Sequence, residues 1–381
     1  MRRSKSPRVT AYIRQICSLG LPDTQVMPEL VEALREMVGA DKGMFFWAGA
    51  DCEIAALYAQ NEAVYRTLDA FAALSGSGHI RALMGDFADW MRGRAHFSNS
   101  AHIDRIFTAS AFFGEVMVPC HCRHLMVSVV RDAKRGRGCF MMTREPGRKP
   151  FDDAEHALLD SFGAHVLHAL QPPRHDPDYR EPALDAMLLL DWQGRILERS
   201  ASGDHLLRLA HDQARGGAPV PVLDRLPPAL QPLLARLQAT QEHRFALPSR
   251  IETQNRWGRF RWRLYPLQER GGSAPLILHL DLQRAATLTL ARGAHRLGLS
   301  VRQQAVGLRW AAGQTQRQIG AELGIKDSTV IDHLRRIYDR LDVRDHAALA
   351  SRLRSAGAHA PDDGGFSPGR RAGSRACAAD G

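Results

Sequence analysis

Hydrophobic residues recur at helical spacing near the start of the chain and then at strand spacing. A helix is predicted over 27–38, because its apolar side chains share one face. Short apolar runs predict strands at 43–48, 53–59, 115–119, 125–131 and 138–143, with helices over 62–74 and 79–91 between them. A further amphipathic helix begins at Asp152 or Asp153 as its N-cap. Residues 8–171 are therefore expected to form one α+β domain.

A proline-rich stretch at 171–177 separates this region from a second one at 180–284. Proline removes an amide donor and restricts the residue before it, so the stretch is predicted to be a linker. The second region is predicted to contain strands at 186–190, 195–198, 257–266 and 276–282 and helices at 204–210 and 228–240. A strand pair, helices and a second strand pair are typical of a small α+β module.

The pattern at 292–355 predicts a bundle of short helices. Ser300 and Thr315 are placed to cap two of them, and Gly313 and Gly324 end them. Gly324 also permits the sharp turn of a helix-turn-helix. A third helix begins at Ser328. Its buried stripe is predicted to be Val330, Leu334, Ile337 and Leu341, and its exposed face to be Ser328, Asp332, Arg335, Arg336 and Asp339, with Thr329, Ile331 and His333 on the flanks.

At these residues the sequence closely resembles the LuxR/FixJ-type helix-turn-helix. The shared pattern comprises Leu299, Ser300, Arg302, Val306, Gly313, Thr315, Ile319, Leu323, Gly324, Ile325, Ser328, Thr329, Val330, His333, Leu334, Ile337, Tyr338, Leu341, Val343 and Arg344. The resemblance implies an all-α four-helix domain that binds double-stranded DNA as a homodimer, with a helix at about 345–353 in the dimer contact. It also implies RNA polymerase as a partner.

Three residues depart from the family pattern. Gln303 replaces an early Glu, Gly307 stands where a Leu normally packs, and Ile331 occupies a position that often presents Lys to DNA. Gly307 is expected to weaken its helix by about 1 kcal/mol, whereas Ile331 is able to contact a thymine methyl group. The DNA-contacting residues that the resemblance implies are Lys326, Ser328, Thr329, Ile331, Asp332, Arg335 and Arg336.

The charge distribution agrees with a polyanionic partner. The net charge is +10 and the pI about 9.7, and residues 292–355 hold twelve Lys plus Arg against six Asp plus Glu. No apolar run reaches the roughly 20 residues of a membrane span, and no signal-peptide core follows the basic start, so a cytoplasmic protein without a membrane partner is expected. Six cysteines are too few for a disulfide scaffold of this length.

Two further resemblances concern the N-terminal regions. The sequence KPFDDAE at 149–155, followed by an apolar helix, is similar to a GAF domain, and LLLDWQGRIL at 188–197 is similar to a PAS-like module. Both families bind small molecules or mediate pairing, so a small-molecule effector is an expected partner. No cofactor or metal is predicted. Residues 356–381 are expected to form a disordered tail.

Cys120, Cys122 and His124 form the cluster that most invites a metal or redox interpretation, because thiolate and imidazole bind zinc, iron and haem. In a strand these residues would share one face, yet no second Cys pair at ligand spacing follows, so a buried strand is favoured. Two other patterns favour simple packing. Residues 44–47 are expected in the core, and the arginines at 259, 261 and 263 alternate with apolar residues as in a sheet packed on one side.

The leading hypothesis is a sequence-specific DNA-binding transcription regulator, controlled by a signal or partner that acts on its N-terminal sensor modules. The alternatives are a redox- or metal-responsive regulator that uses Cys120, Cys122 and His124, and an interaction adaptor with a vestigial DNA-binding domain. A phosphorelay response regulator is not supported, because the early strands do not end in its acidic residues. An enzyme is not expected, because no nucleotide-binding loop, nucleophile elbow or metalloprotease helix is found.

Overall fold

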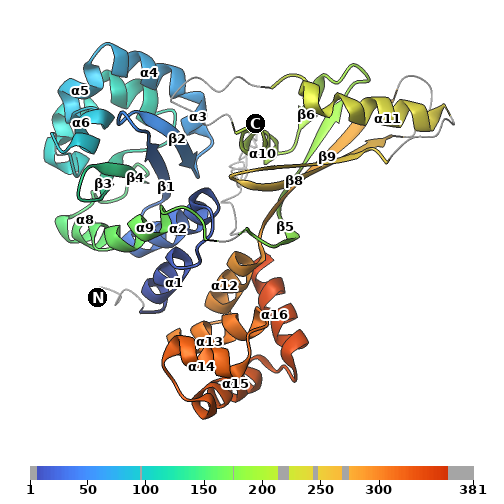
Figure 1. Ribbon diagram of the computed structural model, residues 1–381. Coiled ribbons are helices and arrows are strands. Elements are labelled where there is room, and N and C mark those ends of the chain that lie inside the picture. Colours follow the sequence, from blue (N-terminus) through green and yellow to red (C-terminus); the bar gives the residue numbers. More distant parts are fainter. Residues whose placement is uncertain are drawn as a thin grey trace, which may run out of the picture.

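The computed structural model describes residues 7–94, 97–174, 176–212, 223–242, 248–267 and 274–358. Two antiparallel sheets with helices lie side by side, and a helical C-terminal region lies below them in the view of Figure 1. The α+β and all-α parts expected from the sequence are therefore both present. Within the described ranges, no helix combines the length and apolar character needed to cross a membrane.

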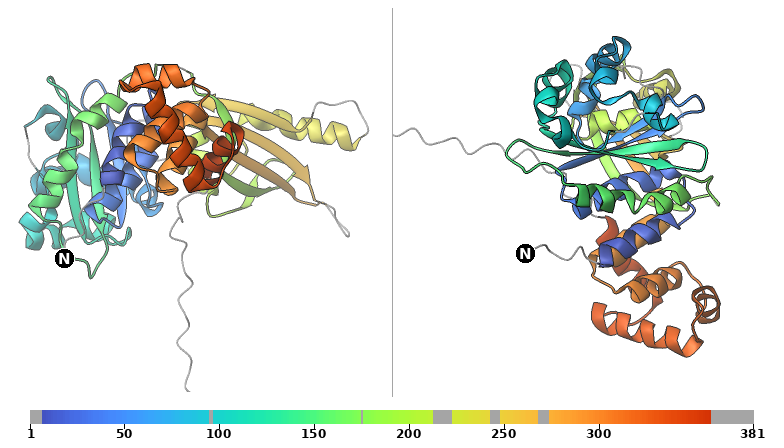
Figure 2. Two further views of the ribbon diagram at one scale, coloured as in Figure 1. Left: turned by 90° about the horizontal axis from the view of Figure 1, so that it is seen from below. Right: turned by 90° about the vertical axis from the view of Figure 1, so that its left-hand side faces the viewer.

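The first sheet is enclosed by helices on both faces (Figure 2). Its strands are β1 (Lys42–Ala48), β2 (Ile54–Ala59), β3 (His124–Arg131) and β4 (Gly136–Arg144), in the order β2-β1-β4-β3. One face packs against α2 (Asp23–Val38), α8 (Asp153–Asp160) and α9 (Gly163–Ala169), and α1 (Pro7–Cys17) packs on α2 and α9. In β1, Phe45 and Trp47 belong to this core, and Met44 and Phe46 to the core on the opposite face.

The opposite face is covered by short helices rather than by the long ones predicted. They are α3 (Ala63–Arg66), α4 (Leu68–Gly76), α5 (His79–Met84), α6 (Phe87–Arg92), η1 (Ser100–Ile103), α7 (Asp104–Thr108) and η2 (Phe113–Met117). The predicted helix over 79–91 is broken at Gly85, whose φ of 79° is left-handed. The predicted strand at 115–119 is wrong, because this segment is the π-helical η2 and a following turn. Its buried Val116 and Met117 face the core of the sheet from a helix instead.

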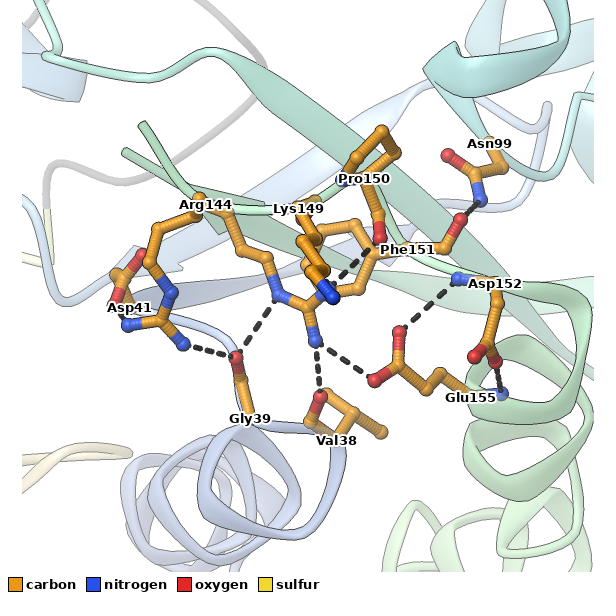
Figure 3. Close-up of polar contacts among 11 residues, drawn as sticks. Val38, Gly39, Asp41, Asn99, Arg144, Lys149, Pro150, Phe151, Asp152 and Glu155 are labelled. Atoms are coloured by element: carbon orange, nitrogen blue, oxygen red, sulfur yellow. Dashed lines mark hydrogen bonds and ion pairs between the residues drawn. The ribbon is translucent and has the colours of Figure 1, made fainter. Parts of the chain in front are cut away.

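Arg144 fixes the end of β4 to the loop that carries the GAF-like sequence (Figure 3). Its guanidinium donates to the carbonyl oxygens of Val38, Gly39, Lys149 and Pro150 at 2.8–3.1 Å and pairs with Glu155 at 2.9 Å. The same group lies 4.0 Å from the ring centroid of Phe151. Asp152, one of the two N-caps that the sequence predicted, caps α8 and forms a capping box with Glu155. The loop is therefore held by a buried, fully bonded cation.

Among the described residues, helices cover one face only of the second sheet. Its strands are β5 (Tyr179–Leu190), β6 (Ile196–Arg199), β7 (Arg250–Asn255), β8 (Gly258–Pro266) and β9 (Leu276–Ala285), in the order β6-β5-β9-β8-β7. The covering helices are α10 (Gly203–Ala210), η3 (Pro228–Leu230) and α11 (Gln231–Gln241). Phe260, Trp262 and Leu264 point into this core at 0–3% exposure, which confirms the one-sided packing predicted for β8. Strand β7 was not predicted.

Strand β9 continues directly into α12 (Ala286–Arg296), which leads to the C-terminal helices. The sequence predicted a boundary here and no helix. Helix α12 packs against α1, and it makes its largest contact with the last helix, α16 (His346–Ala358). Helix α16 extends to Ala358, so residues 356–358 of the predicted tail are helical. The rest of that prediction lies outside the described residues.

Candidate DNA-binding site

Three helices form the helix-turn-helix, and the first two begin with reciprocal caps. They are α13 (Val301–Ala311), α14 (Gln316–Leu323) and α15 (Asp327–Leu341). The Ser300 hydroxyl accepts from the amide of Gln303 while the Gln303 side chain accepts from the amide of Ser300, at 3.4 and 2.9 Å. Thr315 and Gln318 repeat this arrangement. The caps predicted at Ser300 and Thr315 are confirmed, and Gln303 performs the role of the Glu that it replaces.

The aliphatic stripe of α15 is buried as predicted at three of its four residues, whereas Leu341 is half-buried against the same core. Val330, Leu334 and Ile337 are 0–5% exposed and belong to one core with Val306 of α13 and Ile319 of α14. Gly324 has a φ of 63°, so it takes the left-handed turn between α14 and α15 without strain. Rotation by 100° per residue then directs the opposite face of α15 to solvent.

The predicted DNA-contacting residues all belong to α15 or its N-cap. Lys326, Ser328, Asp332, Arg335 and Arg336 are exposed, and Thr329 is half-buried. Ile331 is 48% exposed, so its side chain is accessible to a ligand. Neither Arg335 nor Arg336 forms an ion pair with any described residue, so both guanidinium groups are available to a ligand.

The start of α15 differs from those of α13 and α14. Its N-cap residue, Lys326, makes no side-chain capping bond. A helix start without a side-chain cap leaves backbone amides that favour a negatively charged group, and the Lys326 ammonium adds positive charge beside them. The arrangement suits a phosphate oxygen at this end of α15 and base edges further along its exposed face.

Helix α16 buries its apolar side within the same chain. Leu349, Ala350, Leu353 and Gly357 are buried against α12 and the helix-turn-helix, whereas the exposed side carries His346, Ala347, Ser351, Arg352 and Ser355. The dimer contact that the sequence resemblance implied for this helix stays a prediction. A contact made through the exposed side would be mainly polar.

The cysteine cluster does not have the geometry that was predicted. Cys120 and Cys122 lie in the turn after η2, and among the three residues His124 alone belongs to β3. Burial raises the pKa of both thiols, that of Cys122 to about 11, so both are neutral near pH 7. His124 Nε2 lies 3.0 Å from the carbonyl oxygen of Arg148. The residues that the structure describes contain no group of three His, Cys, Asp or Glu side chains arranged for a metal ion.

The two thiols instead line an apolar cavity of about 40 Å³ between the first sheet and helices α3, α4 and η2. Its walls include Met44, Phe46, Val64, Phe71, Phe112 and Met141. The surface that they present to the cavity is apolar, so the space favours an uncharged occupant over an ion. Sequence reasoning missed the cavity, although it correctly placed 44–47 in the core, with exposures of 0–7%.

Residues 297–353 match the family model described as bacterial regulatory proteins, luxR family. The chain therefore carries a LuxR-family helix-turn-helix domain, as the sequence resemblance implied. No curated protein sequence matches the chain significantly.

Solved structures match only distantly. A phage VqmA–DPO complex is 18% identical over 46% of this chain and 84% of that chain, with a TM-score of 0.18. A Vibrio cholerae VqmA dimer is 12% identical with the same coverage and a TM-score of 0.16. The E. coli DhaR(N)–DhaL complex is 13% identical over 74% of this chain and 91% of that chain, with a TM-score of 0.20. Scores of this size do not establish a fold shared by the whole chain.

Proposed function

Starting from the LuxR-family domain at residues 297–353, we propose that this chain is a sequence-specific transcription regulator controlled through its N-terminal regions. One observation carries the proposal. Helix α15 buries Val330, Leu334 and Ile337 and thereby presents Arg335, Arg336 and Asp332 to solvent on one face. A helix with this presentation fits the major groove of double-stranded DNA.

The residues of α15 divide into two proposed roles. Lys326 and the first amides of the helix, with Ser328 and Thr329, contact phosphate oxygens and set the register of the domain on the duplex. Arg335, Asp332 and Ile331 read base edges, and Arg336 contacts the backbone at the far side of the groove. Ile331 contributes an apolar contact of the kind that a thymine methyl group accepts.

The signal or partner that controls the chain is proposed to act on the GAF-like region at 8–171 and the PAS-like region at 180–284. The apolar cavity against β1 is the candidate site, and its walls favour a small uncharged apolar effector. The proposal describes a cytoplasmic homodimer that works with RNA polymerase and has no enzymatic activity of its own. Control by an effector requires that it bind the two functional states of the chain with different affinities.

Selection of random-sequence DNA duplexes by the purified full chain tests the proposed sequence-specific DNA binding. The proposal expects enrichment of one motif, and enrichment of none at physiological salt would contradict it, because charge alone gives sequence-independent binding. The input is tested separately by titration with xenon, a small apolar probe suited to a cavity of this size, followed by xenon NMR. The expected result is saturable binding that Val64→Phe, a substitution at the wall of the cavity, weakens.

A further inference from the structure

A carboxylate of the first region is buried against two arginines that lie outside this region. Glu29 lies on α2 and is 7% exposed. Its Oε2 accepts from Arg292 Nε at 2.9 Å and from the Tyr12 hydroxyl at 3.1 Å, and its Oε1 contacts Arg292 Nη2 and, at 3.4 Å, Arg284 Nη1. Arg284 is the penultimate residue of β9 and Arg292 lies on α12, and these two residues are 8% and 5% exposed.

The same cluster reaches the DNA-binding domain. Arg292 Nη1 donates to the carbonyl oxygen of Gly357, near the end of α16, at 3.1 Å. Helices α12 and α16 are in close contact there, because a Cβ on Gly293 would collide with the Leu353 carbonyl oxygen and a Cβ on Gly357 with that of Thr289. Two helices packed this closely move together. A displacement of Arg292 is therefore passed to α16.

Helix α2 is in turn connected to the apolar cavity and to the second sheet. Trp47 of β1 donates to Asp23 at the start of α2 at 2.8 Å, and the neighbouring Phe46 lines the cavity. Gln25 of α2 donates to the Tyr179 hydroxyl of β5, also at 2.8 Å. Glu29 thus lies where the first region, the second region and the C-terminal helices meet.

A buried ion pair of this kind fixes the relative position of the elements it joins and adds little net stability. Replacing such a pair with apolar residues is often neutral or stabilising, whereas removal of one partner leaves an uncompensated buried charge. Apolar contacts tolerate sliding, but the hydrogen bonds of the Glu29 carboxylate are satisfied at one relative position of α2 and α12.

We propose that Glu29 is a positioning residue, which fixes the orientation of the helix-turn-helix relative to the N-terminal regions through Arg292 and α12. An effector that shifts α2 withdraws the carboxylate and frees α12 and α16 together. The inference rests on the proposed function, because its readout is DNA binding by a dimer. Fixed orientation of two domains sets the half-site spacing that they bind.

The test uses the full chain and duplexes that carry two copies of the selected half-site at varied spacing. Glu29→Gln is expected to weaken binding to the best spacing about tenfold and to flatten the dependence on spacing, with single half-site binding unchanged. Glu32→Gln is the matched control, since Glu32 lies on the same helix and pairs with Arg35 within it. It is expected to bind with wild-type affinity and spacing.

The double variant E29Q/R292M separates positioning from stability and covers the case in which E29Q folds poorly. It removes the charges of Glu29 and Arg292 and leaves that of Arg284, so it is expected to recover part of the thermal stability while the spacing preference stays flat. Recovery of wild-type spacing preference together with stability would overturn the inference, as would an E29Q protein with unchanged spacing preference. Absence of any selected motif for the wild-type chain would instead refute the proposed function.

Discussion

The indole Nε1 of Trp310 on α13 donates a hydrogen bond to the hydroxyl of Tyr338 on α15, at 2.8 Å. Both side chains are half-buried and they join two helices, and Tyr338 lies about 60° around α15 from Arg335, beside the exposed face. The bond therefore restrains the rotation of α15 about its axis, and with it the direction of the side chains proposed to contact DNA.

Tyr338→Phe removes this acceptor and retains the ring. Loss of one partly buried hydrogen bond is expected to lower the free energy of unfolding by about 1 kcal/mol. Urea unfolding followed by Trp fluorescence measures the change. Tyr265→Phe is a suitable control, because Tyr265 is 47% exposed on β8. Equal effects of the two substitutions would contradict a specific role for the Trp310 bond.

Arg335→Ala removes the guanidinium proposed to read base edges. Affinity for the selected duplex is expected to fall by about 1–3 kcal/mol, with relaxed preference at one base pair and unchanged unfolding. Gel-shift titration against a panel of single-base variants measures both effects. Arg66→Ala removes an exposed arginine of the first region and is expected to leave binding unchanged. A uniform loss across all duplexes would instead indicate that Arg335 contacts phosphate.

Gly307→Ala is expected to stabilise the C-terminal domain. A Cβ at this position would lie 3.4 Å from Ile337 Cδ1, which is ordinary contact, and Ala exceeds Gly in helix propensity by about 1 kcal/mol. Gly320→Ala is the contrasting variant on α14. Its Cβ would lie 2.8 Å from the carbonyl oxygen of Ile325, so destabilisation is expected. The melting temperatures should move in opposite directions, and a shared direction would contradict the packing described.

The structure explains why Gly307 was only half understood from the sequence. Its cost to helix propensity was evident, but the room for a Cβ beside Ile337 depends on the distance between α13 and α15. The helix-turn-helix itself was predictable, because caps such as Ser300 and turns such as Gly324 are local signals. The burial of Val330 followed from helical periodicity alone.

Elements that depend on distant contacts were missed. Helix α12 contains Thr and Gly and has no strong local signal, and it is stabilised by packing on α16 through Gly293. The segment around Val116 has a short apolar pattern that fits a strand or a helix, and the surrounding core decides between them. The contact between Glu29 and Arg292 joins residues 263 positions apart, which no pattern within the sequence reveals.

His295 makes the stability of the chain depend on pH. Burial, assisted by the charges of Arg8 and Arg296, lowers its pKa from 6.5 to about 4, and its ring stacks on that of Tyr12 at 4.3 Å. Below pH 6.5 the unfolded chain therefore binds a proton that the folded chain does not. The free energy of unfolding is expected to fall as the pH drops from 6.5 toward 4 and to be fully retained above that window.

His295→Phe keeps a stacking ring and removes this titration. Its unfolding free energy, measured by urea at a series of pH values, is expected to fall less steeply across the window than that of the wild-type chain. Some loss of unfolding free energy at low pH should persist in the variant, because burial also lowers the pKa of His124, His165 and His211. Parallel curves for variant and wild type would show that His295 does not contribute.

The exposed face of α15 is proposed to distinguish one DNA sequence from another. The most direct test is the ratio of dissociation constants for the selected duplex and a scrambled duplex of equal length and composition, measured with the full chain at physiological salt. The expected ratio is at least about 10³. A ratio near one, with affinity that falls steeply for both duplexes as salt is raised, would contradict it.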